Sequence, residues 1–91
     1  MIDVPRALRL ATDTGQVRFG AREVRRAVKG RAAKLVVLAS NCPKDLRAAL
    51  GEARVYDFAG TNVELGAACG VPFSVAAMAV LTPGESNILS V

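Results

Sequence analysis

Residues 34–39, which read Lys-Leu-Val-Val-Leu-Ala, constrain the fold more than any other stretch of the sequence. After its first residue the run is entirely apolar, with β-branched and other aliphatic side chains, which is typical of a strand that is covered on both faces. Such a strand needs an apolar layer on each side. Helix-like and strand-like segments alternate along the rest of the chain. The sequence therefore predicts an α/β fold, a three-layer α/β/α sandwich built on a four-stranded mixed sheet.

Helix caps and chain breakers set the expected ends of these elements. Asp3 can cap a helix that ends before Gly15, and Thr61 with Glu64 forms a capping box for a helix that ends at Gly70. A Pro-Gly turn and a short helical or irregular tail are expected at 82–91. The predicted helices are 4–14, 21–29, 43–50 and 62–69, and the predicted strands are 16–19, 34–39, 54–58 and 73–81.

The predicted helix 21–29 carries an unusual amount of positive charge on one side. At about 100° per residue its two faces differ sharply in character. An ordinary solvent-exposed face mixes charges of both signs, whereas this face has no acid within it and Glu23 lies at its flank. We therefore expect a face for a polyanion such as nucleic acid, with a plain solvated surface as the alternative. The basic face carries Arg22, Arg25, Arg26 and Lys29, and the opposite face packs through Val24, Ala27 and Val28.

Composition narrows the classes of function. The formal net charge is +4, histidine is absent, and the two cysteines, Cys42 and Cys69, are far apart. Zinc fingers and thioredoxin-type chemistry are therefore not expected, and no glycine motif for a nucleotide cofactor is present. The longest apolar run is about half of what a membrane span requires. We expect one cytoplasmic domain over residues 1–91, with no cofactor, metal, membrane partner or small-molecule substrate.

Four single residues allow two interpretations each. Glu23 can accept hydrogen bonds from a base or simply suit the helix dipole. Asn41 follows the buried strand and can read a base edge or cap the helix predicted at 43–50. Cys42 is either a small apolar filler or the nucleophile of a small enzyme, and Phe73 is either a core residue or a platform for an extruded base.

Several longer stretches together resemble one known family. These are "TGQVRFGAREV", "GRAAKLVVLASNCPKDL", "VYDFAGTNVELGAACGVPF" and "PGESNIL", and they span nearly the whole chain in the same order. They resemble the L30e family of large-subunit ribosomal proteins from archaea and eukaryotes, within the wider superfamily of kink-turn RNA-binding proteins. The resemblance implies a non-enzymatic protein that binds a sharply bent internal loop of ribosomal RNA containing tandem sheared G·A pairs.

The resemblance also implies where RNA is contacted. A turn and helix start enter the RNA, Arg26 and the basic face meet phosphates, a second loop lies at the RNA, and an apolar side shelters an extruded nucleotide. The implied contact residues are Gly20, Ala21, Arg22, Glu23 and Arg26, then Asn41, Cys42, Pro43 and Lys44, then Phe73 and Val75 with Pro83, Gly84, Glu85 and Ser86. The basic face adds Lys29 to the predicted RNA-binding residues.

Two departures from the family pattern stand out. Arg22 occupies a position where many relatives have asparagine and some have lysine, which leaves open whether it contacts a base or a phosphate. The segment from Pro43 to Arg54 is short, so contacts made through a longer third helix are not expected. The sequence thus predicts a ribosomal protein with ribosomal RNA and neighbouring large-subunit proteins as partners. The alternative is a kink-turn-binding protein of another RNA particle that guides modification or processing.

Overall fold

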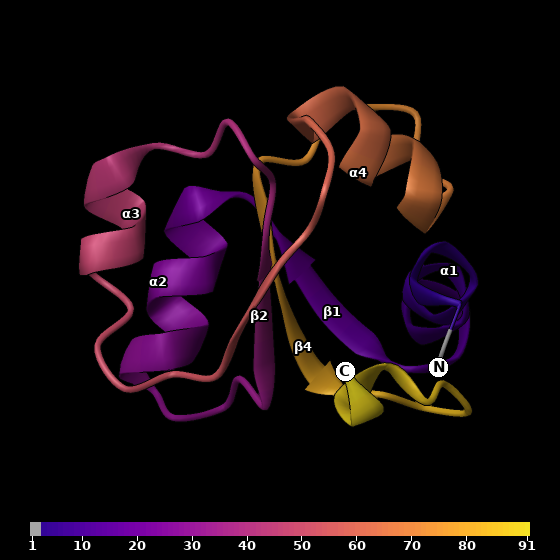
Figure 1. The fold of residues 1–91 in the computed structure, drawn as a ribbon. Coiled ribbons are helices and arrows are strands. Elements are labelled where there is room, and N and C mark those ends of the chain that lie inside the picture. The colour runs from indigo at the N-terminus through magenta and orange to yellow at the C-terminus, as the bar shows by residue number, and fades with distance from the viewer. Residues whose placement is uncertain (1–2) are drawn as a thin grey trace.

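The computed structural model describes residues 3–91, and its elements form three layers. One sheet has the strand order β1-β4-β2-β3, in which β4 is antiparallel to both of its neighbours and β2 is parallel to β3. Helices α1 and α4 cover one face, and α2 and α3 cover the other (Figure 1). The predicted α/β/α sandwich with a mixed four-stranded sheet is confirmed. The elements are α1 Val4–Thr14, β1 Gln16–Phe19, α2 Ala21–Lys29, β2 Leu35–Leu38, α3 Lys44–Ala48, β3 Val55–Asp57, α4 Asn62–Cys69, β4 Ala77–Thr82 and the 3-10 turn η1 Ile88–Ser90.

Strand β2 lies at the centre of the core. All four of its residues are buried, and their side chains alternate between the two layers. Leu35 and Val37 join the cluster under α1 and α4, whereas Val36 and Leu38 join the cluster under α2 and α3. The prediction of a strand covered on both faces is therefore confirmed.

The predicted caps form as expected. The Asp3 side chain accepts a hydrogen bond from the backbone N–H of Arg6 at 3.3 Å. At α4 the backbone N–H of Glu64 donates to the Thr61 hydroxyl at 3.4 Å, while that of Thr61 donates to the Glu64 carboxylate at 3.1 Å. Gly70 then ends α4 in the left-handed region, with φ of 75°. These local signals fix where the helices on the α1 and α4 side begin and end.

The predicted strands 34–39 and 54–58 are each one residue too long at both ends, and two other predicted elements differ more. The last strand begins at Ala77, so residues 73–76 of the predicted strand 73–81 are not part of the sheet ladder. Instead the backbone N–H of Val75 donates to the carbonyl of Asn62 at 2.9 Å, which holds this segment against the start of α4. The predicted helix 43–50 is also shorter, because α3 spans only Lys44–Ala48 and the chain then turns through hydrogen bonds such as Leu50 N–H to Arg47 O at 3.2 Å.

Candidate nucleic-acid interface

Four loops meet at one end of the sheet. Because β4 runs antiparallel to β1 and β2, its first residue lies beside the last residues of those strands. Hydrogen bonds join the loops directly, from Gly20 N–H to Ala77 O at 2.9 Å and from Ser40 N–H to Gly60 O at 2.8 Å. We call this end the loop edge and define it by residues 20–23, 40–44, 59–63 and 72–76. This is the upper end of the sheet in Figure 1, with helix α4 beside it.

The first loop turns sharply into α2. Gly20 has φ of 95° and ψ of 154°, and a Cβ atom there would meet nothing within 4 Å. The glycine is therefore required by the backbone conformation and not by lack of space. No side chain caps α2, so its first backbone N–H groups face outward beside Arg22 and Glu23. A helix start of this kind attracts anions, which suits the predicted entry into RNA.

Helix α2 presents the basic face that the sequence predicts, with one correction. Val24 and Ala27 are buried, and the four basic residues of the face are exposed. The face contains no acid of its own, but acids beside it neutralise part of its charge, because Arg25 pairs with Asp45 of α3 at 3.1 Å and Arg26 pairs with the flanking Glu23 at 3.7 Å. The sequence pattern missed Asp45 because it belongs to another helix. Of the four, only Arg22 and Lys29 form no salt bridge within residues 3–91.

Asn41 connects the second loop to α4. Its amide oxygen accepts from the backbone N–H of Asn62, and its amide nitrogen donates to the Asn62 side chain, both at 2.9 Å. The predicted alternative, a cap for the helix at 43–50, is wrong, since no side chain caps α3. One N–H and one lone pair of the Asn41 amide stay available. Asn41 is exposed, so its potential to read a base edge stays a prediction.

The remaining residues of this loop differ in accessibility. Pro43 and Lys44 are exposed, with Lys44 at the start of α3. Cys42 is half-buried and packs against the core cluster under α2 and α3, as a small apolar residue does.

The other free thiol, Cys69, is buried, and desolvation raises its pKa to about 11, an effect that the hydroxyl of Thr12 partly offsets. Within residues 3–91 no group of acids and cysteines is arranged to hold a metal ion.

An apolar surface flanks the fourth loop. Phe73 is 52% exposed, and its ring meets that of Phe19 edge to face, with centroids 5.7 Å apart and planes at 83°. Beside it lies a hollow of about 280 Å³ lined by Val63, Ala67, Val71, Pro72, Phe73 and Ser74. Phe73 is therefore a surface residue and not a core residue. Val63, which is 67% exposed in the first turn of α4, was not predicted, although an apolar residue so close to a helix cap is a signal that was available.

Five residues of the predicted RNA surface are not exposed at the loop edge. Val75 lies within its fourth loop, but its side chain is only 1% exposed and belongs to the core under α1 and α4. The loop Pro83, Gly84, Glu85 and Ser86 follows the other end of β4, at the edge opposite Phe73. There the backbone N–H of Glu85 donates to the Thr14 hydroxyl at 2.9 Å, and the Ser86 hydroxyl donates to Ala7 O at 2.6 Å. This loop fixes α1 and does not join the loop edge.

The structure adds one cation that the sequence interpretation did not include. Arg18, exposed on the edge strand β1, lines a hollow of about 180 Å³ together with Glu23 and Arg26. The alternation of polar and apolar residues in β1 placed Arg18 on a solvent face, but only the packing of α2 beside β1 brings it to Arg26. The basic surface of α2 thus continues onto the sheet edge.

Comparison with known proteins agrees with this geometry. A family model described as "Ribosomal protein L7Ae/L30e/S12e/Gadd45 family" matches residues 3–90. The chain belongs to this family. It is 47% identical to the large ribosomal subunit protein eL30 of Methanosarcina mazei, over 98% of this chain and 88% of the relative. It is 45% identical to the protein of the same name from Methanothermobacter thermautotrophicus, over 97% of this chain and 96% of the relative.

A third relative, eL30 of Methanococcus maripaludis, is 44% identical over 99% of this chain and 91% of its own length. These relatives confirm the family that the sequence motifs indicate. The matches run through the loop edge and α2 as well as the core, since they cover nearly all of both chains. Among residues 3–91, no helix combines the length and the apolar character needed to cross a membrane.

Proposed function

We propose that this protein is a non-enzymatic constituent of the large ribosomal subunit that binds a kink-turn in ribosomal RNA. One observation carries the proposal, namely that the fold brings Gly20–Glu23, Asn41–Lys44 and Phe73 to the same edge of the sheet, beside the basic face of α2. The names of the relatives, which are ribosomal proteins of the large subunit, support it. The same proposal implies that neighbouring large-subunit proteins are its partners and that it is located in the cytoplasm.

Each part of the loop edge has a chemical role in this proposal. Arg22, Arg26 and Lys29 contact phosphates, which set the register of the RNA on the protein. Glu23 and the free N–H and lone pair of Asn41 face base edges, where a carboxylate and an amide discriminate between donors and acceptors. Phe73 offers an exposed ring on which an extruded base stacks, and Ala21, Cys42, Pro43 and Lys44 shape the two loops between them.

The rigidity of the loop edge supports specific binding. The Asn41–Asn62 bonds and the contact between Phe19 and Phe73 hold the loops in place before any RNA arrives. Pre-organised loops lose little conformational entropy on binding, so more of the contact energy appears as affinity. The surface proposed here leaves out Val75, which is buried, and Pro83–Ser86, whose loop is hydrogen-bonded to α1.

The proposal is tested by measuring the affinity for three RNAs of equal length: a kink-turn, the same RNA with its G·A pairs replaced by Watson–Crick pairs, and a plain duplex. We expect the kink-turn to bind most tightly. If about four phosphates are contacted, the logarithm of its affinity constant falls with the logarithm of salt concentration at a slope near −3. Equal affinity for all three RNAs would refute kink-turn recognition.

A second measurement separates the ribosome from other RNA particles. The tagged protein, expressed in an archaeal cell, should sediment with the large subunit in a sucrose gradient at low magnesium. Sedimentation with a small ribonucleoprotein that guides RNA modification or processing would instead support the alternative.

A further inference from the structure

Asn62, the first residue of α4, joins its own loop to two others at the loop edge. Its backbone N–H donates to Oδ1 of Asn41, and its side-chain oxygen accepts from Nδ2 of Asn41, both at 2.9 Å. Its carbonyl oxygen accepts from the backbone N–H of Val75, also at 2.9 Å. One residue thus holds both the loop that carries Asn41 and the segment that carries Phe73.

These bonds fix which atoms of the Asn41 amide face Asn62 and which face outward. A backbone N–H can only donate, so Oδ1 of Asn41 must lie against it, and Nδ2 is then directed to the Asn62 side-chain oxygen. Turning the amide by half a turn would place Nδ2 against the backbone N–H, donor against donor, and that bond would be lost. Because Asn41 is exposed, its remaining N–H and lone pair face outward in one fixed order.

The order of donor and acceptor on an amide decides which base edge it matches. Base edges differ in how their donors and acceptors follow one another, so an amide held in one orientation binds some edges and is repelled by others. An amide that turns freely suits either order and discriminates less. An amide that is already fixed also loses less entropy when it binds.

We propose that Asn62 is a positioning residue for RNA recognition, which sets base specificity by holding the Asn41 amide in one orientation. The inference rests on the proposed function, because it takes Asn41 to meet a base edge of the kink-turn. It goes beyond that function in assigning part of the specificity to a half-buried residue that acts through an exposed one.

Proline at position 62 separates this role from the stability of α4. Asn62 is the first helical residue, where the helix makes no use of the backbone N–H and proline is favoured. The preceding residue, Thr61, has φ of −76° and ψ of 174°, the extended conformation that a following proline favours. Asn62→Pro therefore removes both bonds to Asn41, keeps the carbonyl that is bonded to Val75, and should lower Tm only slightly.

Affinity for kink-turn RNA measures the effect. We expect Asn62→Pro to bind this RNA about tenfold more weakly and Asn62→Ala, which loses only the side-chain bond, about threefold more weakly. In an Asn41→Ala background, Asn62→Pro should change the affinity by less than about twofold. A full effect in that background would show that Asn62 does not act through Asn41 and would overturn the proposal. So would affinity equal to that of the native protein in both single variants.

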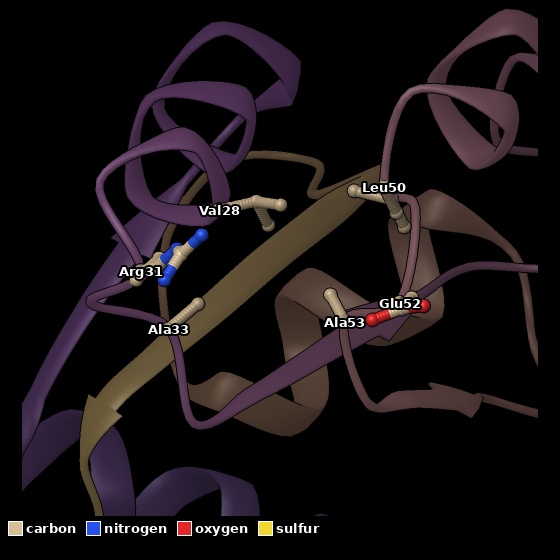
Figure 2. Close-up of a pocket in the computed structure, with 6 residues that line it drawn as sticks. All are labelled: Val28, Arg31, Ala33, Leu50, Glu52 and Ala53. Carbon is tan, nitrogen blue, oxygen red and sulfur yellow. The ribbon is translucent and has the colours of Figure 1, made fainter.

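Asn62→Asp is the conservative variant that should rescue binding. A carboxylate oxygen accepts from Nδ2 of Asn41 as the amide oxygen does, and the backbone N–H is kept. Adding Glu52→Gln restores the net charge of the native chain. Glu52 precedes β3, at the end of the sheet opposite the loop edge, and Figure 2 shows it across a hollow of about 310 Å³ from Arg31. We expect the double variant to bind kink-turn RNA nearly as tightly as the native protein, and affinity as low as that of Asn62→Pro would contradict the proposal.

A cap variant controls for the stability of α4. Thr61→Ala removes the hydroxyl that accepts from the backbone N–H of Glu64 at 3.4 Å but leaves both bonds between Asn41 and Asn62. It should lower Tm more than Asn62→Pro does and lower RNA affinity less. The reverse ranking would assign the effect of Asn62→Pro to the helix and would overturn the proposal.

Discrimination between RNAs separates this inference from the proposed function. We expect the native protein to prefer the kink-turn over the RNA with Watson–Crick pairs and Asn62→Pro to lose most of that preference. Native protein without the preference contradicts the proposed function. Native protein with the preference, matched by Asn62→Pro, contradicts only the positioning role of Asn62.

Discussion

Replacing Gly66 by alanine tests how closely α4 must approach the segment that carries Phe73. Gly66 is buried, and a Cβ atom there would lie 2.1 Å from the carbonyl oxygen of Phe73 and 3.3 Å from the Cα atom of Ser74. Carbon and oxygen normally approach to about 3.3 Å at closest. The Phe73 segment would therefore have to move by about 1 Å. Backbone atoms on both sides of the contact cannot rotate away as a flexible side chain can.

Two effects of opposite sign compete in this variant. Alanine in the middle of a helix is favoured over glycine by about 0.5 to 1 kcal/mol. Overpacking in a well-packed core costs about 1 to 3 kcal/mol or more, and a contact of 2.1 Å belongs at the upper end. We expect a net loss of about 2 to 2.5 kcal/mol. For a domain of this size the loss corresponds to a fall in Tm of roughly 8 to 20 °C.

Thermal unfolding followed by circular dichroism measures this change. Ala67→Gly, at the exposed neighbouring position of α4, gives the size of the propensity effect alone and should lower stability only by about 0.5 to 1 kcal/mol. The folded fraction of Gly66→Ala should also lose affinity for kink-turn RNA, because Phe73 is displaced. An unchanged or higher Tm for Gly66→Ala would show that the close approach does not constrain the fold.

Three further substitutions or conditions give results of predictable sign. If Glu23 reads a base, Glu23→Gln should weaken kink-turn binding by about 1 to 3 kcal/mol, although the substitution also frees Arg26 from its ion pair. Equal or tighter binding in a gel-shift assay would contradict the base-reading role of Glu23. Phe73→Ala should weaken RNA binding by about 1 to 3 kcal/mol. Loss of the ring contact with Phe19 should lower the free energy of unfolding by only about 0.5 to 1.5 kcal/mol, in addition to the effect of the lost buried area, which is small because Phe73 is 52% exposed. A large loss in Tm with intact RNA affinity would show that Phe73 has a structural role. Stability should fall between pH 9 and 11, by about 1.4 kcal/mol per pH unit, because the unfolded thiol of Cys69 ionises near 9.0 whereas the buried thiol keeps its proton until about 11. Denaturant titrations of Cys69→Ala should lack that decline, and its persistence would assign the effect to another group.

The sequence alone determined the layers of the fold. The apolar run of β2 predicted a strand that is packed on both faces. The capping residues Asp3, Thr61 and Gly70 fixed helix ends through hydrogen bonds to residues nearby in the sequence. The two faces of α2 also followed directly, because helical period and residue type decide which side is buried. These features depend on local interactions, so they are readable without coordinates.

The tertiary structure decided which residues share a surface. Asp45 neutralises Arg25, and Arg18 joins Arg26, only because different elements pack side by side. The motif that contains Pro83–Ser86 supports the family assignment but lies at the end of β4 opposite the loop edge, since strand direction and not sequence similarity sets which loops meet.

Phe73 and Val75 show the same limit at the scale of single residues. Alternation on a strand would have placed both on one face, but the chain leaves the sheet before Ala77 and bends over the start of α4. One side chain is thereby exposed and the other buried. Local periodicity predicts faces only while an element continues, and long-range contacts such as that between Gly66 and Phe73 decide where the element stops.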